Sequence, residues 1–132
     1  MKTYESAEDY LERILMLEGE YGRDNVHAIE VANALGFSRA SVSIAMHRLE
    51  ESGHIRFGEA KQLILTDSGR AIAKDIYGRH QILQAFFVSL GVPKEKAEED
   101  ACKVEHDLSK ESFDAIKAYM ETKGKDGSLR LF

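Results

Sequence analysis

The stretch ANALGFSRASVSIAMHRLEESG, residues 32–53, decides the fold. Its first part completes a short helix predicted over residues 27–35, and Gly36 stands where a left-handed residue commonly closes a helix. Ser38 is expected to cap a third helix over residues 39–51. Two short helices joined by a tight turn that contains glycine are typical of the helix-turn-helix motif.

The residues on both sides of this motif extend it into a winged module. Apolar residues at helical spacing predict a helix over residues 6–18 ahead of the motif, with Ser6 as its N-terminal cap. Behind the motif, apolar and polar residues alternate over 55–57 and again over 63–65, which predicts a β-hairpin. A hairpin that directly follows the second helix of such a motif is a wing.

Three further helices are predicted in the second half of the chain. Thr66 is expected to cap a helix of about 22 residues, whose apolar stripe includes His80. A second helix is predicted over residues 94–107, and Ser109 is expected to cap a third. Residues 123–132 are predicted to form a tail with an apolar end.

The predicted fold class is therefore mainly α with a small β-hairpin. A winged helix-turn-helix domain is expected over residues 1–70, followed by a helical domain over residues 71–132. The chain has 132 residues, of which 43% are hydrophobic, so two small modules can each bury a core.

Composition and charge limit the function classes. The apolar runs are far shorter than a membrane span, and no signal-peptide pattern opens the chain. Cys102 is the only cysteine and has no partner for an internal disulfide, so we expect a cytoplasmic protein. The net charge of −5 opposes DNA binding unless a local basic face or bound cations offset it.

The second helix of the motif carries small polar residues on the exposed face near its N-terminus. Such side chains approach base edges and phosphates without bulk, and Arg39 is the best candidate for guanine contact. The predicted contacts to double-stranded DNA are Ser38, Arg39, Ser41, Ser43, Arg48, Arg56 and Lys61. Each of them alone is better explained by a cap or a solvated charge. The order of elements over residues 26–65 favours DNA binding, and a winged-helix protein-interaction module is the alternative.

The segment CKVEH, residues 102–106, carries the strongest chemical pattern in the chain. Its thiol, carboxylate and imidazole are spaced i, i+3 and i+4, which places them on one face of the predicted helix. His80 lies on the apolar stripe of the preceding helix, and Asp9 and Glu12 form an i, i+3 pair on the first helix. Taken singly, His80 is better explained as a core histidine, Asp9 can be a capping residue and Glu12 a solvated carboxylate. Together with Cys102, Glu105 and His106 they make six candidate metal ligands.

An enzyme is the least favoured class, because no complete catalytic set is visible. The cysteine and histidine of the segment resemble a thiol enzyme's pair. However, the neighbouring carboxylates disfavour the thiolate that such an enzyme needs, whereas a bound cation favours it.

With these motifs, the chain resembles the iron- and manganese-dependent repressors of the DtxR/MntR family over roughly residues 4–120. The matching stretches are SAEDYLERI, the helix-turn-helix quoted above, LTDSGRAIA, GRHQILQAF and DACKVEHDLS. The resemblance implies a homodimer whose residues 71–132 bind metal and dimerise. It also implies that the metal-loaded dimer binds a palindromic operator and represses genes of metal homeostasis.

Carried over residue by residue, the resemblance places metal ligands at Asp9, Glu12, His80, Cys102, Glu105 and His106. The first two resemble the manganese branch of the family, and Cys102 resembles the iron branch. Gln84 and Glu98 fall at ancillary metal positions, where neither residue type matches. The resemblance therefore implies Mn²⁺ or Fe²⁺, with Co²⁺ or Zn²⁺ able to bind in vitro. A metal-independent winged-helix repressor is the alternative.

Overall fold

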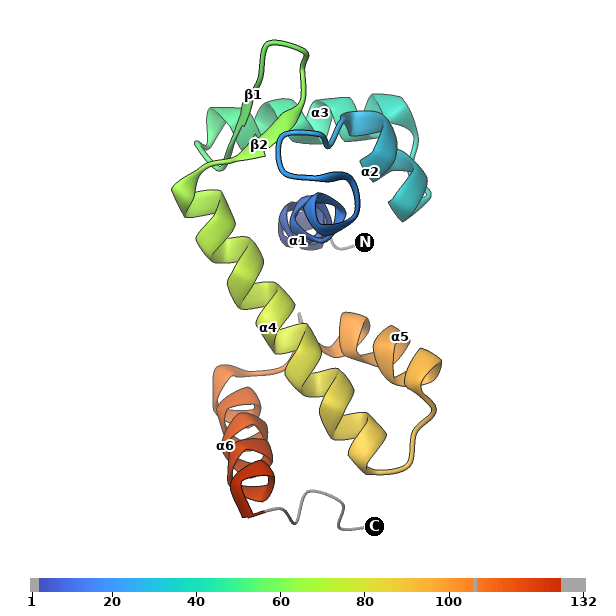
Figure 1. Cartoon of the computed structure of the whole chain (residues 1–132), viewed down its shortest axis with the longest axis vertical. Coiled ribbons are helices and arrows are strands. Elements are labelled where there is room, and N and C mark those ends of the chain that lie inside the picture. The colour runs from blue at the N-terminus through green and yellow to red at the C-terminus, as the bar shows by residue number, and fades with distance from the viewer. Residues whose placement is uncertain (1–2, 106, 127–132) are drawn as a thin grey trace. The chain divides into compact units, whose positions relative to one another are not determined.

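The computed structural model describes residues 3–105 and 107–126, without the side chains of the first four and last four of these residues. The chain divides into two compact units, Met1–Asp75 and Ile76–Phe132. The elements are α1 (Thr3–Tyr21), α2 (Ala28–Leu35), α3 (Arg39–Glu51), β1 (Ile55–Phe57), β2 (Leu63–Leu65), α4 (Asp67–Ser89), α5 (Lys94–Val104) and α6 (Lys110–Asp126) (Figure 1). The predicted fold class, mainly helical with one hairpin, is confirmed. No helix of the described residues is long and apolar enough to cross a membrane.

The first unit packs three helices and a hairpin around one core. Its largest fully buried side chains come from every element of the unit, as expected for a single cooperative core. They are Leu11, Ile14, Val26, Val31, Val42, Met46, Ile55 and Leu63.

The turn between α2 and α3 has the predicted chemistry. Gly36 adopts a left-handed conformation with φ of 71°, and its N–H donates to the carbonyl oxygen of Ala32. The N–H of Ser41 donates to the hydroxyl oxygen of Ser38 over 3.1 Å, so Ser38 caps α3 as predicted. These two local features set where the second helix of the motif begins.

The wing is an antiparallel two-stranded hairpin. Ile55 pairs with Leu65 and Phe57 with Leu63, so the predicted hairpin is confirmed. The N–H of Leu63 donates to the carbonyl oxygen of Val26 over 2.7 Å, which fixes the hairpin to the segment ahead of α2.

The start of α4 is held tightly to the rest of the first unit. The N–H of Gly69 donates to the hydroxyl of Thr66, which confirms the predicted cap. Arg70 forms a two-pronged ion pair with Glu18 of α1, with N–O distances of 2.8 and 3.1 Å. This hydrogen bonding raises the pKa of Arg70 further above its ordinary value.

The second unit is a three-helix cluster formed by α4, α5 and α6. Leu83 of α4, Ala101 of α5 and Phe113 of α6 form its buried centre. The N–H of Ser112 donates to the hydroxyl of Ser109, so the predicted cap of α6 is confirmed.

Three predicted boundaries were wrong. α1 begins at Thr3, so Ser6 lies inside the helix, and it continues past Gly19 to Tyr21. α5 ends at Val104 instead of residue 107, and Glu105 is its C-terminal cap. Part of the predicted tail, residues 123–126, belongs to α6, and residues 127–132 lie outside the described part of the chain.

We predict that Gly69→Ala destabilises the protein by roughly 1–3 kcal/mol, the usual range for overpacking. A Cβ atom at this position would overlap with the carbonyl oxygen of His54. That oxygen accepts a hydrogen bond from the N–H of Thr66, so it cannot retreat without breaking the bond. Urea unfolding followed by circular dichroism measures the change.

Gly78→Ala is the matched control on the same helix, because no heavy atom lies within 4 Å of a Cβ atom placed there. Since alanine favours helix over glycine, Gly78→Ala is expected to stabilise the protein by up to about 1 kcal/mol. Equal stability of the two variants would show that the contact with His54 relaxes freely.

Candidate functional site

The predicted DNA contacts lie on the surface of the first unit. All seven residues are exposed, and they come from the start of α3, from the end of α3 and from the hairpin. They are Ser38, Arg39, Ser41, Ser43, Arg48, Arg56 and Lys61. Lys61 adopts a left-handed backbone conformation with φ of 63° in the turn of the wing. The structure therefore gives these side chains access to a partner.

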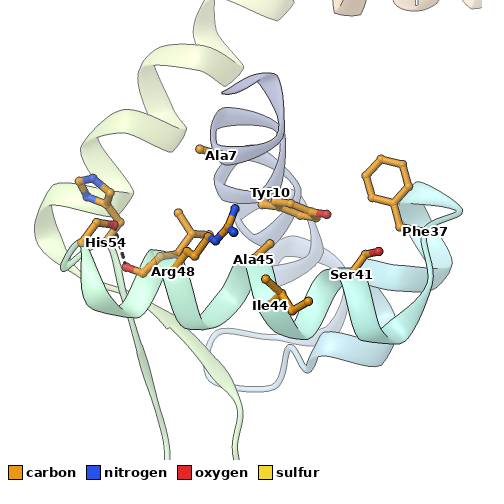
Figure 2. Close-up of a pocket in the computed structure, with 10 residues that line it drawn as sticks. Ala7, Tyr10, Phe37, Ser41, Ile44, Ala45, Arg48 and His54 are labelled. Atoms are coloured by element: carbon orange, nitrogen blue, oxygen red, sulfur yellow. Dashed lines mark hydrogen bonds between the residues drawn. The ribbon is translucent and has the colours of Figure 1, made fainter. Parts of the chain in front are cut away.

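Two of these residues, Ser41 and Arg48, line a groove of about 710 Å³. Figure 2 shows that Ser41 and Arg48 project from α3 toward the side of α1 that carries Tyr10. Phe37 and Ile44 complete the apolar part of its lining. Ser41 is further held by the hydroxyl of Ser38, which donates to its Oγ atom over 2.9 Å.

The second unit brings together a buried imidazole and a buried carboxylate. His80 of α4 and Glu105, at the C-terminal end of α5, are only 5% and 1% exposed. Their Nδ1 and Oε1 atoms lie 3.1 Å apart. An imidazole nitrogen and a carboxylate oxygen are both ligands of divalent first-row metals, so these two residues fit the metal that the sequence predicts.

The backbone of Glu105 is fixed by a residue that sequence reasoning missed. The Nη2 atom of Arg79 donates to the carbonyl oxygen of Glu105 over 2.9 Å. The guanidinium group of Arg79 also lies over the ring of Phe113, 5.0 Å from its centroid. Arg79 thus links α4, the end of α5 and α6 at the residue that supplies the carboxylate. The only signal in the sequence is that Arg79 precedes His80.

The remaining predicted ligands lie in different surroundings. Asp9 and Glu12 lie on α1 of the first unit, where Asp9 is half-buried and Glu12 is buried. Burial, together with the charge of Asp9, raises the pKa of Tyr10 above its ordinary value. Cys102 is exposed on α5. His106 lies outside the described residues.

The two predicted ancillary positions are both in the second unit. Gln84 is half-buried on α4, and Glu98 is exposed on α5. An exposed carboxylate is held less rigidly than the buried pair, so these positions offer a weaker site than His80 and Glu105 do.

Comparison with known proteins decides the family. The model for the N-terminal DNA-binding domain of iron-dependent repressors matches residues 2–63. The model for their metal-binding and dimerisation domain matches residues 66–126. The chain belongs to the DtxR/MntR family of metal-dependent transcriptional repressors. The family prediction is thereby confirmed, and with it the divalent metal as the family's cofactor.

Individual relatives agree with this assignment. The chain is 36% identical over 114 residues to the transcriptional regulator MntR of Bacillus pumilus, which covers 86% of this chain and 78% of the relative. It is 35% identical over 118 residues to an uncharacterised helix-turn-helix regulator of Methanocaldococcus jannaschii, covering 89% and 94% of the two chains.

Solved structures have the same fold. A manganese-dependent transcriptional repressor in complex with manganese matches with a TM-score of 0.78 and 31% identity, over 87% of this chain. The T. acidophilum IdeR structure matches with a TM-score of 0.76 and 24% identity, over 89% of this chain. The chain spans about half the length of these two proteins, at 52% and 53%.

We predict that two substitutions separate the capping role of Ser38 from its predicted contact with DNA. Ser38→Ala removes the cap of α3 and is expected to lower the free energy of unfolding by about 0.5–2 kcal/mol. Ser38→Asn keeps a capping oxygen, so stability is expected to stay near that of the wild type. Its bulkier side chain is expected to weaken DNA binding, as measured by fluorescence anisotropy. Unchanged DNA affinity in Ser38→Asn would leave Ser38 with the capping role alone.

Proposed function

We propose that this chain is a homodimeric repressor that binds a palindromic operator when Mn²⁺ or Fe²⁺ occupies a site built on His80 and Glu105. The observation that supports the metal site is the contact between the buried imidazole of His80 and the buried carboxyl group of Glu105, whose Nδ1 and Oε1 atoms lie 3.1 Å apart. The proposal assigns DNA binding to residues 1–70, and metal binding and dimerisation to residues 71–132. It places the protein in the cytoplasm and gives it no catalytic activity.

The proposed ligand set adds four residues to this pair: Asp9, Glu12, Cys102 and His106. The support for them is the match of their sequence positions to the family's ligands. Because Asp9 and Glu12 belong to the DNA-binding part, a shared ion would couple the two parts of the chain. Gln84 and Glu98 are proposed as weaker, ancillary ligands.

The bound cation supplies positive charge that offsets the mutual repulsion of the carboxylates. The chain's own residues then set the geometry: Arg79 holds the backbone of Glu105, and the hydrogen bond to Glu105 orients the ring of His80. In a two-fold dimer the recognition helices must lie about 34 Å apart to enter successive major grooves. To change the population ratio of this arrangement to all others from 1:99 to 99:1, the metal must bind this arrangement more favourably by about 5.5 kcal/mol.

The choice of metal follows from the ligand types and from supply. Carboxylates suit Mn²⁺ and Fe²⁺, whereas imidazole and thiolate also suit later metals. In vitro, Co²⁺ and Zn²⁺ are expected to bind more tightly than Mn²⁺, in the Irving–Williams order. We propose that cellular availability selects Mn²⁺ or Fe²⁺.

We predict that His80→Ala and Glu105→Gln each weaken metal binding by at least roughly 10–100-fold. Substituting a residue that only hydrogen-bonds to a metal ligand already lowers metal affinity by this factor. The test is an anaerobic titration of the full chain with Mn²⁺ or Fe²⁺, read out by the anisotropy of a labelled operator. Isothermal calorimetry with the metal alone gives a second readout that does not depend on DNA. Glu99→Gln is the control, because Glu99 is an exposed carboxylate of α5 that pairs with Lys96.

The outcomes separate the proposal from its alternatives. Wild-type affinity for the operator in the presence of a chelator would make the protein a metal-independent repressor. Absence of any salt-sensitive DNA binding would favour a protein-interaction module. Unchanged metal affinity in both His80→Ala and Glu105→Gln would move the site elsewhere.

A further inference from the structure

The side of α3 that faces away from the core of the first unit is exposed. The buried residues of the helix are Val42, Met46 and Leu49. Successive residues of a helix are about 100° apart, so Ile44 and His47 point to the opposite side, one turn from each other. Both side chains are exposed. In a helix-turn-helix protein, the side of this helix remote from the core is the side that enters the major groove.

Ile44 is an unusual residue for an exposed helix face. It is 57% exposed, the largest exposed fraction among the exposed large apolar residues in the described part of the chain. Figure 2 shows it on α3 beside Ala45, at the groove lined by Tyr10 and Phe37. In the major groove, the one apolar group that distinguishes a base is the C5-methyl of thymine, and apolar side chains contact it.

His47 has a defined tautomer and a fixed orientation. Its Nδ1 atom lies 2.8 Å from the carbonyl oxygen of Ser43. A carbonyl oxygen only accepts hydrogen bonds, so Nδ1 carries the proton, and Nε2 of the neutral ring is an acceptor. The ring also packs against Phe57 of the wing, with centroids 5.2 Å apart. In the major groove, an acceptor of this kind matches the exocyclic amine of adenine or cytosine.

We propose that Ile44 and His47 read base identity in the operator. Ile44 contacts a thymine methyl group, and Nε2 of His47 accepts a hydrogen bond from an exocyclic amine. Residues at i and i+3 are about 5–6 Å apart on a helix surface, so the two contacts fall on neighbouring base pairs. This inference rests on the proposed DNA-binding function and adds the base groups that it recognises.

The experiment begins with operators selected from a randomised pool of double-stranded DNA by the manganese-loaded full chain. Each thymine of a selected operator is then replaced by uracil, which removes only the methyl group. At one thymine of a half-site, wild-type affinity is expected to fall roughly fourfold, the factor for burying one methyl-sized group. Ile44→Ala is expected to bind the thymine and uracil operators equally at that position.

A parallel series tests His47. Purine replaces adenine and 2-pyrimidinone replaces cytosine, so each substitution removes one exocyclic amine and identifies which base supplies it. Wild-type affinity is expected to fall about 2–12-fold at one position, the range for a neutral hydrogen bond. His47→Ala is expected to be insensitive there. Glu50→Gln, an exposed change on another side of α3, is expected to keep both sensitivities.

Three results would overturn the inference or its basis. If the manganese-loaded chain selects no DNA, the proposed function fails, and this inference fails with it. If DNA is bound but Ile44→Ala keeps the wild-type response to uracil at every thymine, Ile44 does not read the methyl group. If His47→Ala keeps the wild-type response to both amine deletions at every position, the role of His47 is refuted while DNA binding stands.

Discussion

The buried carboxyl group of Glu105, which is only 1% exposed, is the main constraint on the second unit. Removing an ion from water costs several kcal/mol even after the protein relaxes, so Glu105 needs compensation close by. His80 supplies part of it with a hydrogen bond of 3.1 Å, and Arg79 holds the adjacent backbone carbonyl. The metal site proposed above gives this arrangement a reason. Burying a carboxylate is costly in the free protein and favourable when a cation is bound beside it. This difference in free energy lets binding of the ion shift the conformational equilibrium.

Local chemistry made most of the fold predictable. Ser38, Thr66 and Ser109 were identified as caps from residue type alone, because the hydroxyl oxygen satisfies an N–H group that the helix leaves without an internal partner. Alternation of apolar and polar residues identified the hairpin. The helix ends were less predictable. Gly19 costs a helix only about 1 kcal/mol, so α1 continues through it to Tyr21. The helix ends at the next glycine, Gly22, which adopts a positive φ of 100°.

The residue types of the candidate site were predictable from the sequence, but the burial of each side chain and the end of the helix that carries them were less so. The i, i+3, i+4 spacing of the CKVEH segment assumes that a helix extends through residue 107, but α5 ends at Val104. Glu105 lies at the C-terminal cap and is buried, whereas Cys102 is exposed. This difference could not be predicted, because spacing on an ideal helix does not say which part of a face contacts the core. Arg79 escaped prediction for a different reason. Its acceptor is a main-chain carbonyl, which leaves no signature in the residue type.

The charge of the chain bears on how such a protein discriminates among DNA sequences. At a net charge of −5, general attraction to phosphates is weak, and each divalent cation bound adds two positive charges. Weak background affinity makes binding depend more on the ion and on direct contact with the bases. An exposed isoleucine and a histidine whose Nδ1 atom is held by the carbonyl oxygen of Ser43 suit that requirement, since both are side chains that can contact bases directly. A strongly basic helix would bind DNA with the metal absent, and the dependence on the ion would be lost.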